Sequence, residues 1–218
     1  MTLTPRARPF DHVKVTRWLA GRVHPEVMGD CYTFTAIERT TKLLLAWHVG
    51  KRCPEDTRAF AEKLWHATNG RFQQTTDGFK PYLTAIPEIF GRNLDYATLV
   101  KVYGEIEDET ARRRYSPPRI TEVIATPRIG FPDEDRICTS FVERSNLTIR
   151  MQVRRLTRLT NAFSKKWENH EAALALFFAY YNFCRVHMTL KTTPAVKAGL
   201  AELPWTVQEL LLNAGAHR

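Results

Sequence analysis

The sequence of 218 residues contains no apolar run that approaches the roughly 20 residues needed by a membrane-spanning helix. Its N-terminus is rich in arginine and is interrupted by Pro5 and Pro9, so it does not resemble a signal peptide. Cysteine is scarce: the four residues are far apart and form no Cys-x-x-Cys pair. We therefore expect a cytoplasmic protein with reduced thiols, without a membrane segment, a disulfide framework or a zinc site.

Acidic residues are also in short supply, with 23 against 32 basic residues, a net charge of +9 and a sequence pI of about 9.6. A surface of that charge favours a polyanionic partner, and nucleic acid is the commonest one. The hydrophobic content of 44% is ordinary for a globular protein, and the chain is long enough to bury a sizeable core.

The most informative stretch runs from residue 141 to residue 166, which we predict to be helical. Steps of three, four, four and four residues from Glu143 reach side chains that would share one face of a helix, namely Asn146, Arg150, Arg154 and Arg158. Apolar residues occupy a neighbouring face: Ile149, Val153 and Leu156. Such a helix suits a surface that faces an anion beside a hydrophobic core. A solvated face, or an intrahelical ladder of ion pairs, explains the same pattern.

The remaining chain alternates strands and helices. Strands are predicted at 12–15, 31–37, 42–49, 71–76 and 96–103, and helices at 54–68, 81–90, 168–184 and 205–213. The first three strands should form an antiparallel meander that strand 71–76 joins in parallel, giving a mixed sheet flanked by helices in an α/β domain. Residues 1–9 are interpreted as a poorly packed lead-in and residues 104–136 as a surface excursion. Helix 168–184 is apolar nearly all round and should be largely buried.

Two acids stand where these elements begin or end. Asp77 follows strand 71–76, and Glu143 lies in the first turn of the predicted helix. Hard divalent cations prefer such oxygen ligands, and two ions about 4 Å apart can hold both oxygens of a phosphoryl transfer. Each acid also has a structural explanation, because Asp-Gly is a turn dipeptide and a helix N-terminus favours an acid.

Several motifs resemble the catalytic region of bacterial insertion-sequence transposases of the IS-one family. They are Gly29–Ile37, Thr40–Leu43, Val49–Arg52, Thr75–Tyr82, Phe141–Arg150 and Phe163–Lys166. Tyr181–His187, with Leu190 and Thr193–Ala195, resembles the closing segment shared with integrase-type transposases. The resemblance spans roughly residues 29 to 212. It implies a ribonuclease H-like fold, an Asp-Asp-Glu site that binds Mg²⁺ or Mn²⁺, and the cutting and joining of DNA at insertion-sequence ends and target sites.

The resemblance also assigns residues. Asp77 is the second carboxylate and Glu143 the third, while the first strand offers Asp11, with Glu38 and Asp30 as less suitable candidates. The basic residues of the 141–166 stretch would bind DNA phosphates; with Asn146 they are Arg150, Arg154, Arg155, Arg158, Lys165 and Lys166.

The implied organisation is an N-terminal lead-in with a weak first strand (1–28), a catalytic domain (29–200) and a C-terminal helix with a tail (201–218). Family members usually carry an N-terminal DNA-recognition region, for which this sequence has no room, so a truncated or degenerate transposase is expected. Two alternatives stay open. The chain could be a catalytically inactive DNA-binding remnant, or an interaction protein that forms homo-oligomers through helix 168–184.

Overall fold

The computed structural model describes residues 2–3, 31–104, 120–157, 162, 164 and 166–215. The strands are β1 (Thr2–Leu3), β2 (Tyr32–Ile37), β3 (Leu44–Gly50), β4 (Phe72–Thr76), β5 (Leu94–Tyr103) and β6 (Ile120–Ile129). The α-helices are α2 (Pro54–Ala67), α3 (Tyr82–Phe90), α5 (Ser140–Gln152), α6 (Trp167–Phe183), α7 (Pro194–Lys197) and α8 (Val207–Gly215). Two short 3₁₀ helices are η2 (Glu134–Arg136) and η3 (Arg154–Leu156). The predicted α/β class is confirmed.

Among the described residues, the strands form two sheets of three, ordered β1-β2-β3 and β4-β5-β6, where a single mixed sheet was predicted. The first is an antiparallel meander, and the second is mixed, because β4 pairs with β5 in parallel and β6 pairs with β5 antiparallel. The antiparallel pairing of strands 31–37 and 42–49 was predicted correctly, but the described strand that pairs with the other side of β2 is Thr2–Leu3, within the expected lead-in. The predicted strand 12–15 lies outside the described residues. In the described part of the chain, β1 pairs only with β2, and β4 only with β5.

One face of the strands packs against α2 and α3. Pro54 begins α2, and its apolar stripe faces the sheet through Phe60 and Leu64. Aromatic rings dominate the core there: Phe34 of β2 lies 5.5 Å from Phe60 and meets Tyr82 of α3 edge-on at 6.4 Å. Such tilted arrangements stabilise the packing beyond the area that they bury.

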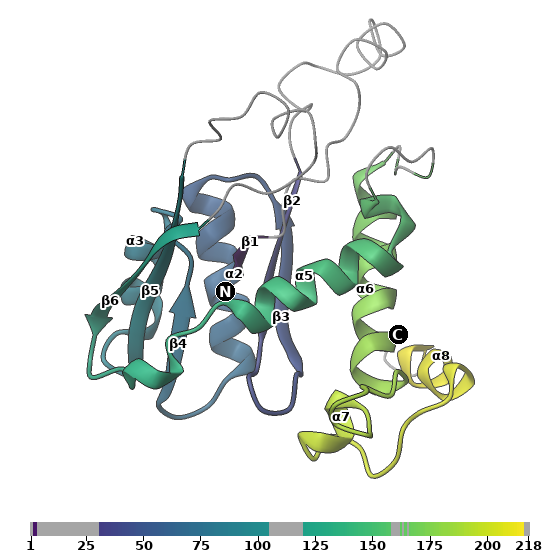
Figure 1. Ribbon diagram of the computed structural model, residues 1–218. Helices are drawn as coiled ribbons and strands as arrows, with labels where there is room; N and C mark the ends of the chain where they lie inside the picture. Colours follow the sequence, from purple (N-terminus) through teal and green to yellow (C-terminus); the bar gives the residue numbers. More distant parts are fainter. Residues whose placement is uncertain are drawn as a thin grey trace, which may run out of the picture.

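The opposite face is covered by α5, η3 and α6, so helices lie on both sides of the strands (Figure 1). A second buried cluster joins Leu44 and Val49 of β3 to Ile149 of α5 and Leu174 of α6. Hydrogen bonds also join α6 to β3. The side-chain amide of Asn182 accepts from the N–H of Leu44 and donates to its C=O, at 3.0 Å each. This part of the closing segment therefore has a structural role at the edge of β3.

The predicted helix 141–166 is interrupted. It ends at Gln152, and Val153 adopts an extended conformation with φ −92° and ψ 95° before η3 begins. The break turns Val153 and Leu156 into the cluster with α6, and the Thr157 hydroxyl donates to the C=O of Arg150 at 3.1 Å, near the helix end. The continuous ridge predicted from helical spacing is therefore wrong beyond Arg150, because packing against α6 outweighed helical continuity.

Helix α6 is less buried than predicted. Leu174, Phe178 and Tyr181 face the core, but the side chain of Leu176 is 55% exposed and that of Tyr180 is 39% exposed. The layer beneath α6 covers one side only, and the short α8 contacts only part of the remainder. None of the helices within the described ranges is long and apolar enough to cross a membrane.

The stretch 120–129 was predicted as part of a surface excursion, but it forms strand β6 on the edge of the second sheet. A clamp follows it. Arg71 binds Asp95 through two hydrogen bonds of 3.0 Å and 2.6 Å, and the N–H of Phe131 donates to the same carboxylate at 2.8 Å. Gln73 holds the backbone of Asp133 by two further bonds of 2.9 Å. The connection from β6 to α5 is thereby fixed to β4 and β5.

The hydrogen bonds of Asp95 make the stability of the fold depend on pH in the acidic range. Hydrogen bonds from Arg71 and Phe131 lower the pKa of Asp95 to about 2 from 3.8. A lowered folded-state pKa stabilises the fold above the unfolded pKa, and this contribution disappears as the pH falls through about 2. Between pH 4 and pH 2 we therefore expect the melting temperature of Asp95→Asn to fall less than that of the wild type. Thermal melts in circular dichroism measure this, with the exposed Asp135→Asn as control; equal acid sensitivity of the wild type and Asp95→Asn would contradict the assignment.

Candidate active site

Asp77 lies directly after β4, as predicted. Its Oδ1 accepts a hydrogen bond from the N–H of Phe79 at 3.1 Å, which closes a tight turn at the strand end. Tyr96 lies near Asp77, and its hydroxyl forms a hydrogen bond of 2.7 Å with the hydroxyl of Thr76. Burial chiefly, and the nearby Asp77 carboxylate to a smaller extent, raise the pKa of Tyr96 to about 12. The carboxylate is half-buried between the strand end and this core.

Glu143 lies in the first turn of α5, again as predicted. Its two carboxylate oxygens are bound by one cation of the chain, the ammonium of Lys101 on β5, at 2.5 Å and 2.6 Å. The hydroxyl of Thr139 donates to Oε1 at 2.9 Å. The carboxylate is therefore held in place by β5 and by the residue that caps the helix.

The two acids belong to the same end of the β4–β5 pair. Thr76 stands opposite Thr98 in the parallel register, so Asp77 follows at the level of Leu99, two positions before Lys101. Lys101 in turn binds Glu143. The strand register and this ion pair therefore place both acids at the same end of β4 and β5.

Of the other predicted carboxylates, the structure describes Glu38, which has a different role. Asp11 and Asp30 lie outside the described residues. Glu38 accepts bonds from the N–H groups of Thr40 and Thr41, at 2.8 Å and 2.5 Å, so it shapes the β2–β3 hairpin. Burial raises the pKa of Glu38, but hydrogen bonds from these threonines outweigh it and lower this pKa below its usual value. Within the described ranges, no group of three or more His, Cys, Asp or Glu residues is placed to hold a metal ion.

The predicted DNA-binding residues separate into exposed and buried ones. Arg150, Arg154, Arg155 and Lys166 are exposed. Asn146 was assigned wrongly to the basic ridge, because its side chain is only 3% exposed and its Oδ1 accepts from the Thr35 hydroxyl at 3.3 Å. The helix turns Asn146 toward β2, so its amide links α5 to the sheet. Arg158 and Lys165 lie outside the described residues.

Sequence reasoning missed the cations around the start of α5. Lys101 lies in a strand, and its link with Glu143 across distant sequence has no local signal. At the β2–β3 hairpin, the Lys42 ammonium lies 3.6 Å from the ring centroid of Phe141, and the Arg39 guanidinium lies 5.5 Å from it. Burial raises the pKa of the Cys138 thiol, but hydrogen bonds from Ser140 and the positive charges of Arg39 and Lys101 outweigh it, so that this pKa is lowered. The N-terminal end of α5 is therefore an electropositive region.

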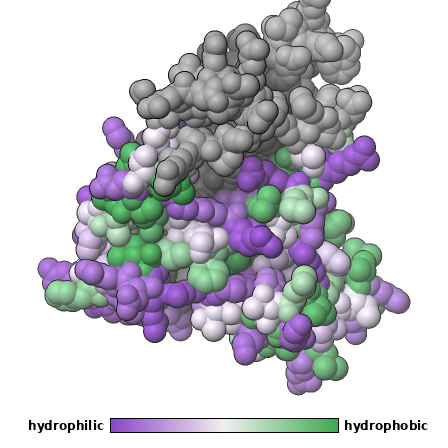
Figure 2. Space-filling model, in the orientation of Figure 1, coloured by the Kyte–Doolittle hydropathy of each residue, from purple (hydrophilic) through white to green (hydrophobic). Residues whose placement is uncertain are grey.

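The visible surface is mixed in character (Figure 2). Hydrophilic side chains run across the face that α5 crosses, and an apolar area lies over β5 and β6. Exposed apolar residues of these strands include Val100, Val102, Tyr103, Ile120, Val123 and Ile124.

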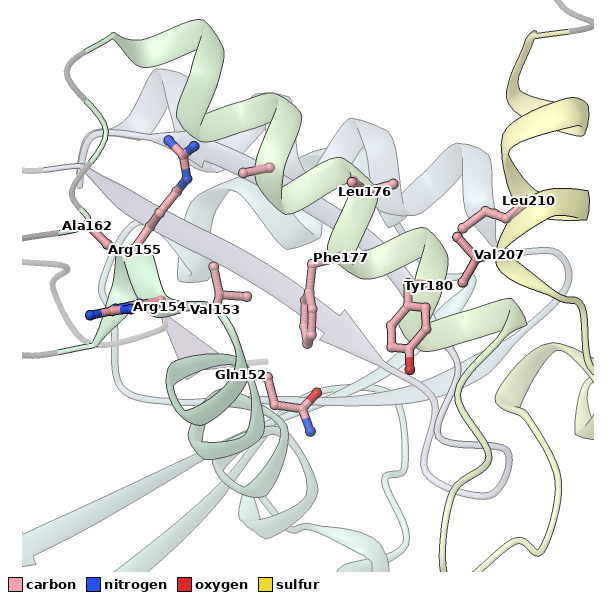
Figure 3. A pocket seen from close by; sticks show the side chains of 11 residues that line it. Gln152, Val153, Arg154, Arg155, Ala162, Leu176, Phe177, Tyr180, Val207 and Leu210 are labelled. Atoms are coloured by element: carbon pink, nitrogen blue, oxygen red, sulfur yellow. The ribbon is translucent and has the colours of Figure 1, made fainter. Parts of the chain in front are cut away.

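A hollow of about 650 Å³ opens between η3, α6 and α8. Figure 3 shows Arg154 and Arg155 at its η3 end and Val207 and Leu210 of α8 at the other, with Phe177 and Tyr180 of α6 between them. The lining residues that the structure describes are apolar side chains, two arginines, a glutamine and a tyrosine, which do not include the carboxylate ligands that a hard divalent cation prefers. The exposed face of α6 borders it, and the oligomer contact through helix 168–184 stays a prediction.

Comparisons with models of protein families, with curated proteins and with solved structures found no match to this chain. Its own side chains and their placement are therefore the basis for a functional proposal.

Proposed function

We propose that the chain is a DNA-processing domain of the insertion-sequence transposase type, which binds DNA ends and cleaves and joins phosphodiester bonds with the help of divalent cations. The observation that carries this proposal is the direction of Asp77 and Glu143, from distant parts of the sequence, to one end of the β4–β5 pair. The fold class and the positive charge of the chain support it.

The chemistry of the two acids fits a hard divalent cation. Carboxylate oxygens are the ligands that Mg²⁺ and Mn²⁺ prefer, and Glu143 already presents both of its oxygens to a cation, the Lys101 ammonium. Asp77 and Glu143 would hold the metal, with Asp11 as the proposed third ligand. Bound metal supplies the Lewis acidity that phosphodiester cleavage requires.

The protein itself would position the DNA. Arg150, Arg154 and Arg155 are exposed beyond Glu143 on the same segment, and their guanidinium groups suit phosphate oxygens. The clamp at Asp95 and the Thr139 hydroxyl hold the start of α5, so the distance between the catalytic acids and the arginines depends on a fixed backbone.

The direct test is metal-dependent nicking of supercoiled plasmid DNA by the purified chain. We expect nicking when Mg²⁺ or Mn²⁺ is present, its loss after chelation and its return when metal is added in excess, because two acids alone supply no Lewis acid. Gel electrophoresis of the plasmid measures the nicked fraction. Nicking that persists in the chelator, or that never exceeds a protein-free control, would remove the catalytic proposal.

A second candidate function is DNA binding without catalysis. It is favoured by the Lys101–Glu143 ion pair, which balances the charge of the carboxylate without a metal. Among the described residues, moreover, no group of three or more His, Cys, Asp or Glu residues is placed to hold a metal ion. Salt-dependent binding to DNA in the absence of divalent cations, without nicking in their presence, would support this candidate over the first.

A further inference from the structure

The ammonium of Lys101 occupies the position from which a cation would bind Glu143. It lies 2.5 Å from Oε1 and 2.6 Å from Oε2, so both oxygens share one positive group. The Thr139 hydroxyl adds a third bond to this carboxylate, at 2.9 Å from Oε1. Hydrogen bonds between an ammonium and a carboxylate are charge-assisted, and they are roughly twice as strong as those between neutral groups.

The ion pair is partly shielded from water. The Lys101 side chain is 21% exposed and that of Glu143 is 43% exposed. Water therefore screens the pair only in part, and the ammonium has a protein partner in the metal-free state.

The Lys101 ammonium lies against both carboxylate oxygens, which is the position that a bidentate metal ion would take. Two positive groups repel each other there, although each oxygen keeps a second lone pair. A metal ion that bound both oxygens of Glu143 would therefore displace Lys101, whose four-carbon stem lets the ammonium move while the strand stays in place.

We propose that Lys101 is a built-in counter-cation of Glu143, which holds the carboxylate in the metal-free protein and has to leave before a divalent cation binds. The proposal rests on the assignment of Glu143 as a metal ligand under the proposed function. Lys101 thereby sets the metal concentration at which the site fills, and it keeps the start of α5 joined to β5 until then.

The test measures Mn²⁺ binding by calorimetry in the absence of DNA. Lys101→Met keeps the length and the apolar stem of the side chain but removes the charge, so we expect it to bind Mn²⁺ about fivefold more tightly, the scale of an ion pair of this exposure. The gain should vanish in Lys101→Met/Glu143→Gln. Lys197→Met on α7, at an exposed lysine away from the strand ends, is the control for lost charge and should bind Mn²⁺ like the wild type. Far-UV circular dichroism establishes that each variant is folded.

A second readout follows the ammonium itself. In wild-type protein, saturating Mn²⁺ should raise the rate at which an amine-reactive reagent labels Lys101, because the displaced ammonium enters solvent, and peptide mass spectrometry reports the rate for each lysine. Labelling of Lys197 should stay constant.

Three outcomes separate the hypotheses. Equal or weaker Mn²⁺ binding by Lys101→Met, or labelling of Lys101 that ignores Mn²⁺, would overturn the counter-cation role and leave the cleavage proposal standing. Absence of Mn²⁺ binding by both proteins would overturn both proposals. A fivefold gain in Mn²⁺ affinity, together with no nicking by wild type or variant, would overturn only the cleavage proposal.

Discussion

Replacement of Asp77 by asparagine is expected to lower metal-dependent DNA nicking at least roughly a hundredfold, because removing a metal ligand costs more than the ten- to hundredfold loss typical of its supporting partners. Glu143→Gln should have a similar effect, since the same metal uses both carboxylates. The double variant should be no worse than either single one, because residues that act as a unit are not additive. The rate of plasmid nicking is the measurement.

Two controls decide what the loss means. Glu202→Gln, at an exposed position between α7 and α8, removes one acidic charge without touching the strand ends and should nick like the wild type. The melting temperature of Asp77→Asn shows whether the turn at Phe79 still forms, and a folded protein with unchanged nicking would eliminate Asp77 as a ligand.

Simultaneous replacement of Arg150, Arg154 and Arg155 by glutamine is expected to weaken DNA binding on the order of a hundredfold at 0.15 M salt. Each phosphate contact contributes about 0.9 to the slope of log K against log salt, so each lost contact costs about fivefold at that salt concentration, and the slope should fall by about 2.7. Binding of a labelled duplex across a salt series measures both quantities.

The triple variant needs a control of equal charge. Lys63, Arg92 and Lys197 are exposed on α2, after α3 and on α7, and their joint replacement removes the same three charges. A similar loss in both triple variants would indicate general attraction to a basic protein, whereas a loss confined to the first identifies the α5–η3 segment as the contact. Equal affinity of wild type and first variant would remove that segment from the interface.

Part of the candidate site followed from local sequence. Asp77 stands where a short strand that ends in two β-branched threonines gives way to Asp-Gly, and Glu143 stands in the first turn of a helix, so both positions could be predicted within one element. Lys101 could not, because nothing near it in the chain indicates that its strand and α5 meet. Asn146 was misplaced for a related reason: helical spacing gives the residues of one face but not which face the sheet covers.

What the sequence by itself determined about this protein is the position of β2 to β5 and of helices α2, α3, α6 and α8, since hydrophobic period, proline and glycine act over a few residues. The tertiary structure alone decided that the helix from residue 140 ends at Gln152, that β6 extends the second sheet, and that Glu143 meets an ammonium from β5. Those outcomes depend on burial and charge compensation between segments far apart in the chain, which no local pattern records.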